Sequence, residues 1–93
     1  MAITRINHFE AAAGRDAELH EFLKSIAPLI EAAPGCRFCR VLRNQESHNQ
    51  LVVIETWDSM AAHQASVKNI PPEKMAEVKP LLAGAPGGAY YVD

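Results

Sequence analysis

The run Gln50-Leu-Val-Val-Ile-Glu-Thr-Trp57 decides the fold of this chain, because residues 51–54 are apolar at every position. Successive side chains of a strand point to opposite faces of the sheet, so a strand with this pattern needs an apolar cover on both faces. The preceding segment 36–43 is also strand-like, and the polar residues 44–49 separate the two. We therefore expect a β-hairpin in which the second strand lies deep in the sheet.

The longest helical pattern lies upstream of this hairpin, between Gly14 and Pro34-Gly35. Its apolar residues recur at steps of three and four, which predicts a helix with one buried face. Pro28 falls inside the pattern and predicts a kink, because a proline ring removes a backbone donor and crowds the carbonyl four residues back. The predicted buried stripe comprises Leu19, Phe22, Leu23, Ile26, Leu29, Ile30 and Ala33.

Shorter elements complete the chain. Residues 2–10 alternate as a first strand, residues 60–67 form a short helix that Asp58 or Ser59 caps, and residues 89–92 form a last strand. Pro71-Pro72 begins a further helical segment that ends before Gly84. The inward stripe of the short helix is predicted as Met60, His63, Gln64 and Val67.

This order of elements predicts one α+β domain over residues 1–93. Strand, helix, strand, strand, helical segment and strand form two β-α-β units, which is the ferredoxin-like split arrangement with a four-stranded antiparallel sheet. Such a fold places its helices on one face of the sheet. The other face is apolar at the middle of the hairpin, so we expect a second copy to cover it in a homodimer.

Composition excludes several classes of partner. The formal net charge is -2 with a pI near 6.0, and the nine Lys and Arg are scattered, so neither nucleic acid nor an anionic membrane is an expected partner. No stretch approaches the roughly 18 apolar residues of a membrane span, and the N-terminus lacks a signal-like apolar run. We expect a cytoplasmic protein.

The two cysteines, Cys36 and Cys39, have the spacing of a redox motif. That chemistry needs the pair at a helix N-terminus, whereas these residues lie in a strand-like run. An offset of three along a regular strand points two side chains to opposite faces, so we expect free thiols, as in a reducing compartment.

Three segments together resemble the antibiotic biosynthesis monooxygenase family: Pro34-Gly35-Cys36, then Val41-Leu42-Arg43, then the hairpin's second strand continued through Asp58-Ser to the helix with His63. In that family a glycine turn leads into the second strand, the third strand ends in Glu-x-Trp, and a histidine follows on the next helix. The resemblance covers nearly the whole chain and implies a dimeric α+β barrel. Similar proteins include cofactor-free oxygenases of quinols and anthrones, haem-degrading enzymes and isomerases of small signalling molecules, and fold alone does not separate these activities.

The resemblance to haem-degrading relatives is incomplete. Asn7 and Trp57 match their strand asparagine and tryptophan, but the helical run 73–79 offers no histidine where their axial haem ligand stands. No histidine and carboxylate pair has a dependable metal spacing either. We therefore expect neither a cofactor nor a metal ion.

The candidate catalytic residues are His63, Asn7 and Trp57. His63 has an ordinary pKa suited to proton removal at neutral pH; Asn7 would donate to a substrate oxygen, and Trp57 would form an aromatic wall of an apolar pocket. Each also has a structural interpretation, as a histidine or asparagine bonded to backbone and a tryptophan of the core. The residues assigned to substrate binding are Arg5, Phe9, Phe22, Met60 and Val67.

The resemblance implies oxidation of a small electron-rich aromatic, such as a quinol or an anthrone, by O2 without a cofactor. One alternative is an isomerase or epimerase, which would return the proton to the same enolate-type intermediate. A second alternative is a dimer that binds a small ligand without turning it over. Dependence of turnover on oxygen would distinguish the oxygenase from the isomerase or epimerase.

Overall fold

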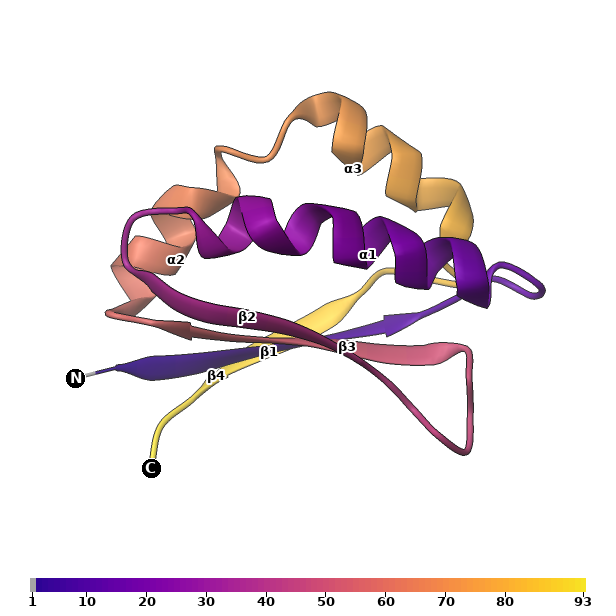
Figure 1. The fold of residues 1–93 in the computed structure, drawn as a ribbon, viewed down its shortest axis with the longest axis horizontal. Helices are drawn as coiled ribbons and strands as arrows, with labels where there is room; N and C mark the ends of the chain where they lie inside the picture. Colours follow the sequence, from indigo (N-terminus) through magenta and orange to yellow (C-terminus); the bar gives the residue numbers. More distant parts are fainter. Residues whose placement is uncertain (1) are drawn as a thin grey trace.

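The computed structural model describes residues 2–93 as a single sheet with helices packed on one of its faces (Figure 1). The elements are β1 (Ile3–Glu10), α1 (Asp16–Glu31), β2 (Cys36–Arg43), β3 (Gln50–Trp57), α2 (Met60–Val67), α3 (Pro72–Val78), a 3-10 turn (Lys79–Leu81) and β4 (Gly87–Tyr91). The predicted element order is confirmed. The last strand begins two residues before the predicted segment 89–92, because Gly87 and Gly88 pair with β1.

The strands lie in the order β2-β3-β1-β4, and every neighbouring pair is antiparallel. This is the ferredoxin-like α+β topology that the order of elements predicted. β3 and β1 occupy the centre of the sheet, whereas β4 lies at one edge. The apolar run in β3 therefore lies in the interior of the sheet, as its composition required.

Strand alternation decides which side chains meet the helices. In β3, Leu51, Val53, Glu55 and Trp57 are buried, while the residues between them are only partly buried. Leu19 and Leu23 of α1 complete the same core with no more than 1% of their surface exposed. At about 25 cal/mol per Å² of apolar area, each fully buried leucine contributes about 1.5–3 kcal/mol.

Two expected helix faces are wrong in part. Leu29, predicted in the buried stripe of α1, is 55% exposed, and the helix ends at Glu31 rather than at Ala33. In α2, Met60 and Val67 are 47% and 52% exposed, and Gln64 is also exposed. A helix of eight residues meets the sheet along a narrow line, so only part of a stripe inferred from spacing is covered.

A β-bulge near the start of β2 corrects the expected placement of the cysteines. The register against β3 shifts between Cys36 and Phe38, so that Cys36 pairs with Trp57 and Cys39 pairs with Glu55. Directly paired residues share a face, and their two partners lie on the helix-facing side. The extra residue thus brings both cysteines to that face instead of opposite ones. Both thiols are free, as expected.

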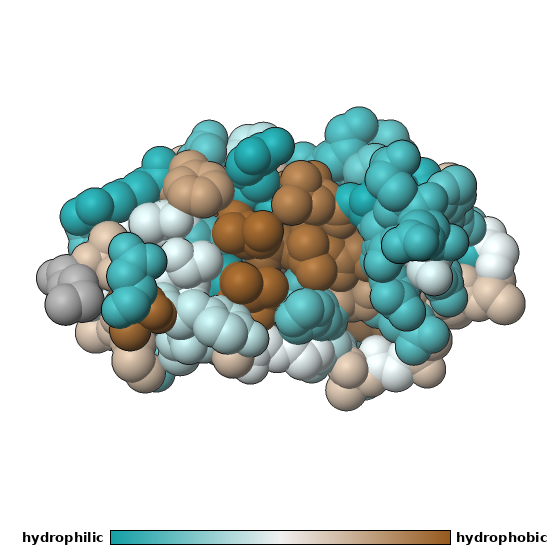
Figure 2. Space-filling model, turned by 90° about the horizontal axis from the view of Figure 1, so that it is seen from below, coloured by the Kyte–Doolittle hydropathy of each residue, from teal (hydrophilic) through white to brown (hydrophobic). Residues whose placement is uncertain are grey.

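The sheet face away from the helices has no cover within the protomer. Its outward residues include Ile6, Leu42, Val52 and Ile54, and Figure 2 shows hydrophobic side chains gathered in the middle of this face. Leu42 is 37% exposed. We call these four residues the outer patch. Elsewhere in residues 2–93, no helix has both the length and the apolarity to cross a bilayer.

Candidate functional site

A buried carboxylate lies at the centre of the candidate site. Glu55 is 4% exposed, and it accepts a hydrogen bond from Nδ2 of Asn7 at 2.9 Å and another from Nε1 of Trp57 at 2.8 Å. Nε of Arg5 donates in turn to Oδ1 of Asn7 at 2.9 Å. β1 and β3 position these groups, because Arg5 pairs directly with Glu55 across the ladder.

His63 and Tyr90 extend this arrangement from two other elements. Nδ1 of His63 lies 2.7 Å from the phenol oxygen of Tyr90, and Nε2 of His63 lies 3.8 Å from Oε1 of Glu55. The imidazole contacts the rings of Trp57 and Tyr90 edge-on, at centroid distances of 5.4 and 5.3 Å. The guanidinium of Arg5 lies 4.7 Å above the Tyr90 ring, within the range of a cation–π contact.

We refer to Arg5, Asn7, Glu55, Trp57, His63 and Tyr90 as the Glu55 network. Its members come from three strands and one helix, so only the folded sheet and α2 bring them together. All the buried side-chain nitrogen and oxygen atoms in the described part of the chain have hydrogen-bond partners.

Local sequence fixes the position of α2. The hydroxyl of Ser59 accepts from the backbone N–H of Ala62 at 3.1 Å, which resolves the choice between Asp58 and Ser59 as the N-cap. Gly35 has a φ of +88°, and a Cβ atom placed on it would lie 2.7 Å from Cβ of Ala62. Glycine at the turn before β2 therefore lets the helix that carries His63 approach the sheet.

Burial sets the protonation of the two titratable groups at the centre. Burial raises the pKa of Glu55, and the hydrogen bond from Trp57, the charge of Arg5 and the hydrogen bond from Asn7 oppose this rise. Burial and the charge of Arg5 lower the pKa of His63 below its ordinary value of 6.5. His63 is therefore neutral at pH 7 and available as a proton acceptor.

The predicted site residues fall into two groups in the structure. His63, Asn7, Trp57 and Arg5 meet in the Glu55 network. The remaining residues assigned to substrate binding lie outside it: Phe9 and Phe22 pack against the core, while Met60 and Val67 are exposed.

Sequence reasoning overlooked the centre of the site. In the sequence, Glu55 stands out only as part of the Glu-x-Trp motif. Tyr90 and Tyr91 are adjacent on the last strand, so alternation points them to opposite faces without deciding which one meets the helices. The sequence does contain a signal for Glu55. It is a carboxylate in a strand whose other residues on the same face, Leu51, Val53 and Trp57, are all apolar and buried. Because of Glu55, the expected apolar pocket around Asn7 and Trp57 is instead a polar network.

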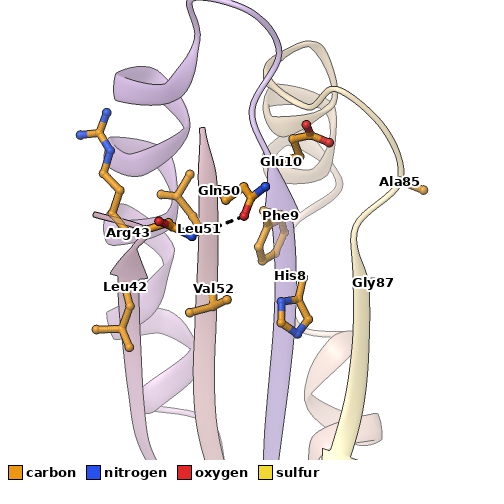
Figure 3. Close-up of a pocket in the computed structure, with 11 residues that line it drawn as sticks. His8, Phe9, Glu10, Leu42, Arg43, Gln50, Leu51, Val52, Ala85 and Gly87 are labelled. Carbon is orange, nitrogen blue, oxygen red and sulfur yellow. Dashed lines mark hydrogen bonds between the residues drawn. The ribbon is translucent and has the colours of Figure 1, made fainter. Parts of the chain in front are cut away.

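A shallow depression lies elsewhere on the protomer, near the hairpin end of the sheet (Figure 3). It is lined mainly by outward residues, among them His8, Leu42, Gln50 and Val52, and contains no member of the Glu55 network. We regard the network as the site because it, and not the depression, combines a buried carboxylate with a neutral histidine. Among residues 2–93, no three His, Cys, Asp or Glu side chains are grouped closely enough to hold a metal ion.

Fold and site together define a small α+β protein of the ferredoxin-like class, with a polar network between its sheet and its second helix. The sequence profile of the antibiotic biosynthesis monooxygenases matches residues 2–77, so this chain belongs to that family. The resemblance inferred from the motifs is confirmed. No curated protein sequence matches the chain significantly.

Solved structures show the same fold across the whole chain. SnoaB, a cofactor-independent oxygenase from Streptomyces nogalater, is 19% identical, with 99% of this chain and 92% of its own covered and a TM-score of 0.81. Rv0793 from Mycobacterium tuberculosis is 19% identical over 100% of this chain and 95% of its own, with a TM-score of 0.83. NE2512 from Nitrosomonas europaea, a protein of unknown function, is 25% identical over 97% and 86%, also with a TM-score of 0.83.

Proposed function

We propose that this protein is a cofactor-independent monooxygenase that oxidises a small electron-rich aromatic, of the quinol or anthrone type, with O2. The observation that carries the proposal is the contact between His63 and Tyr90 beside the buried carboxylate of Glu55. Oxygen reacts with such substrates once they have lost a proton, so a neutral, buried proton acceptor is the group this reaction needs. Family membership and the fold shared with a cofactor-independent oxygenase support the same reaction.

The reaction assigns a role to each part of the network. His63 takes up the proton that the substrate loses. Glu55 is close enough to stabilise the imidazolium that forms. Arg5 and the second N–H of Asn7 stabilise the negative charge that develops on the substrate oxygen. The deprotonated substrate supplies the electrons to O2; one oxygen atom enters the product and the other leaves as water.

Neighbouring groups restrict how the substrate is held. Trp57 is fully buried, and in this proposal its ring forms the wall on the core side of the substrate. Phe9 and Phe22, which pack against the same core, and the exposed Met60 and Val67 remain predictions as substrate contacts. Exclusion of water around the deprotonated substrate would protect it from reprotonation.

We further propose that two protomers associate through the outer patch to form a dimeric α+β barrel. An apolar sheet face of this kind is covered symmetrically when it faces a second copy of itself. Ile54→Lys should then produce a monomer in sedimentation velocity, whereas Met75→Lys on α3, where the side chain is 56% exposed, should leave the dimer intact. A wild-type protein that sediments as a monomer would refute the dimer.

The reaction is tested by oxygen uptake of the metal-stripped protein with a panel of hydroquinones and anthrones, corrected for autoxidation. We expect His63→Ala to lower kcat by about 100-fold or more, the usual contribution of a positioned base, and Trp57→Phe to lower kcat/KM. His48→Ala, in the exposed hairpin turn, is the matched control. Uptake equal to buffer across the panel would reject the oxygenase. Turnover without oxygen would then favour the isomerase, and saturable binding without turnover would favour the ligand-binding dimer.

A further inference from the structure

Neither ring nitrogen of His63 is free to meet a substrate directly. Nδ1 is within hydrogen-bond distance of the Tyr90 hydroxyl at 2.7 Å, and Nε2 faces Oε1 of Glu55 at 3.8 Å. The side chain of His63 is 12% exposed. A base in this position accepts a proton through a neighbour more readily than from a bound molecule.

The surroundings of His63 favour one tautomer. Oε1 of Glu55 already accepts from Trp57, so it is an acceptor facing Nε2. A lone pair on Nε2 would oppose this oxygen, whereas an Nε2–H would be attracted to it. With the proton on Nε2, Nδ1 is the acceptor, and the Tyr90 hydroxyl donates to it.

The members of the Glu55 network differ in how exposed their side chains are. Glu55 and Trp57 are buried, whereas Arg5, Asn7, His63 and Tyr90 are each partly exposed. Tyr90 lies on β4, the edge strand of the sheet, on the same face as Arg5 and Glu55. Because Nδ1 of His63 faces the phenol oxygen of Tyr90 and Nε2 faces Glu55, a small molecule at this site meets the hydroxyl of Tyr90 rather than a ring nitrogen of His63.

We propose that Tyr90 is a catalytic residue whose hydroxyl contacts the substrate and relays its proton to His63. The substrate O–H or C–H bond breaks and its proton binds to the Tyr90 oxygen, while the proton of Tyr90 passes to Nδ1 of His63. The products of the step are a substrate anion, a tyrosine that is neutral again and an imidazolium beside Glu55. This inference rests on the proposed oxygenase reaction, to which it adds the group that touches the substrate.

The test compares the two adjacent tyrosines. Tyr90→Phe removes only the hydroxyl, and Tyr91→Phe makes the same change on the opposite face, where the side chain is 49% exposed. With the hydroquinone that the wild type oxidises fastest, Tyr90→Phe should lower kcat by about 100-fold and leave KM within about threefold, while Tyr91→Phe leaves both unchanged. A kcat for Tyr90→Phe within threefold of wild type would overturn the relay and leave the oxygenase standing.

A second measurement decides the case in which the wild type oxidises no substrate. Nitrogen-15 NMR of the histidine rings distinguishes the two tautomers directly, without turnover. We expect His63 of the wild type to carry its proton on Nε2 and its Nδ1 signal to shift in Tyr90→Phe toward that of an unbonded nitrogen. A proton on Nδ1 in the wild type would overturn the relay, whatever the outcome of the oxygen experiment.

Discussion

Gly88 pairs with Asn7 across the sheet, and a Cβ atom placed on Gly88 would lie 2.5 Å from Oδ1 of Asn7. The same atom would lie 2.5 Å from a terminal nitrogen of Arg5. The side chains of Arg5 and Asn7 thus occupy the space that any other residue at position 88 would fill. The edge strand leaves room for the Glu55 network at this point.

Gly88→Ala should therefore displace Asn7 and Arg5 from the network. Overpacking of this kind costs about 1–3 kcal/mol of unfolding free energy, and we expect urea denaturation to show a loss in that range together with reduced turnover. Gly87→Ala is the matched control, since a Cβ there meets nothing within 4 Å. Equal stabilities of the two variants would contradict the close packing at Gly88.

Glu55→Gln should weaken the fold through Trp57 and Asn7. Both side chains donate to the carboxylate, and an amide can accept from only one of them while it presents its own N–H to the other. A buried donor left unpaired costs about 1–3 kcal/mol. Trp57 is the only tryptophan, so its fluorescence reports both the unfolding transition and the altered contact.

Glu46→Gln, in the exposed hairpin turn, controls for the loss of a charge. Unchanged stability and emission in Glu55→Gln would contradict this prediction, because relief from burying a carboxylate would then offset the lost hydrogen bond in full.

Stability should fall as the pH drops below 6.5, in part because of His63. Its pKa in the folded protein is lower than the ordinary value of 6.5, so the unfolded chain takes up the proton first. The contribution of His63 is complete above 6.5 and is lost as the pH falls through the folded pKa. Urea denaturation between pH 5 and 7.5 should show a shallower pH dependence for His63→Gln than for wild type. His48→Gln should retain the wild-type slope, and an identical slope in all three proteins would refute the lowered pKa.

The two thiols should react slowly at neutral pH. Burial, followed by the charges of Glu55 and Glu31, raises the pKa of Cys36 from 9.0 to about 11. Burial together with Glu55, Cys36 and Glu31 raises that of Cys39 to about 12. Each unit lowers the thiolate fraction tenfold, so a disulfide reagent at pH 8 should label the folded protein at least about 100-fold more slowly than the urea-unfolded chain. Labelling at similar rates in both states would contradict this, and would reopen a redox role for the pair.

Local pattern determined the fold of this protein. The apolar run in β3 required an interior strand, the spacing of Leu19 and Leu23 required a helix with one buried face, and the order of elements left the ferredoxin-like topology as the arrangement with short connections. These features depend on residues within one element. The sequence also predicted that His63, Asn7 and Trp57 share a site. Their side chains lie together in the Glu55 network, and their roles remain predictions.

Only the tertiary structure decided which contacts connect His63, Asn7 and Trp57. The hydrogen bond between Asn7 and Glu55 spans 48 positions, and that between His63 and Tyr90 spans 27, so neither distance follows from periodicity. The bulge that places Cys36 and Cys39 on one face depends on the register between two strands. The exposure of Met60 and Val67 depends on how much of α2 the sheet covers. Periodicity defines the face of each element, whereas contacts between elements depend on register and packing, which no single element contains.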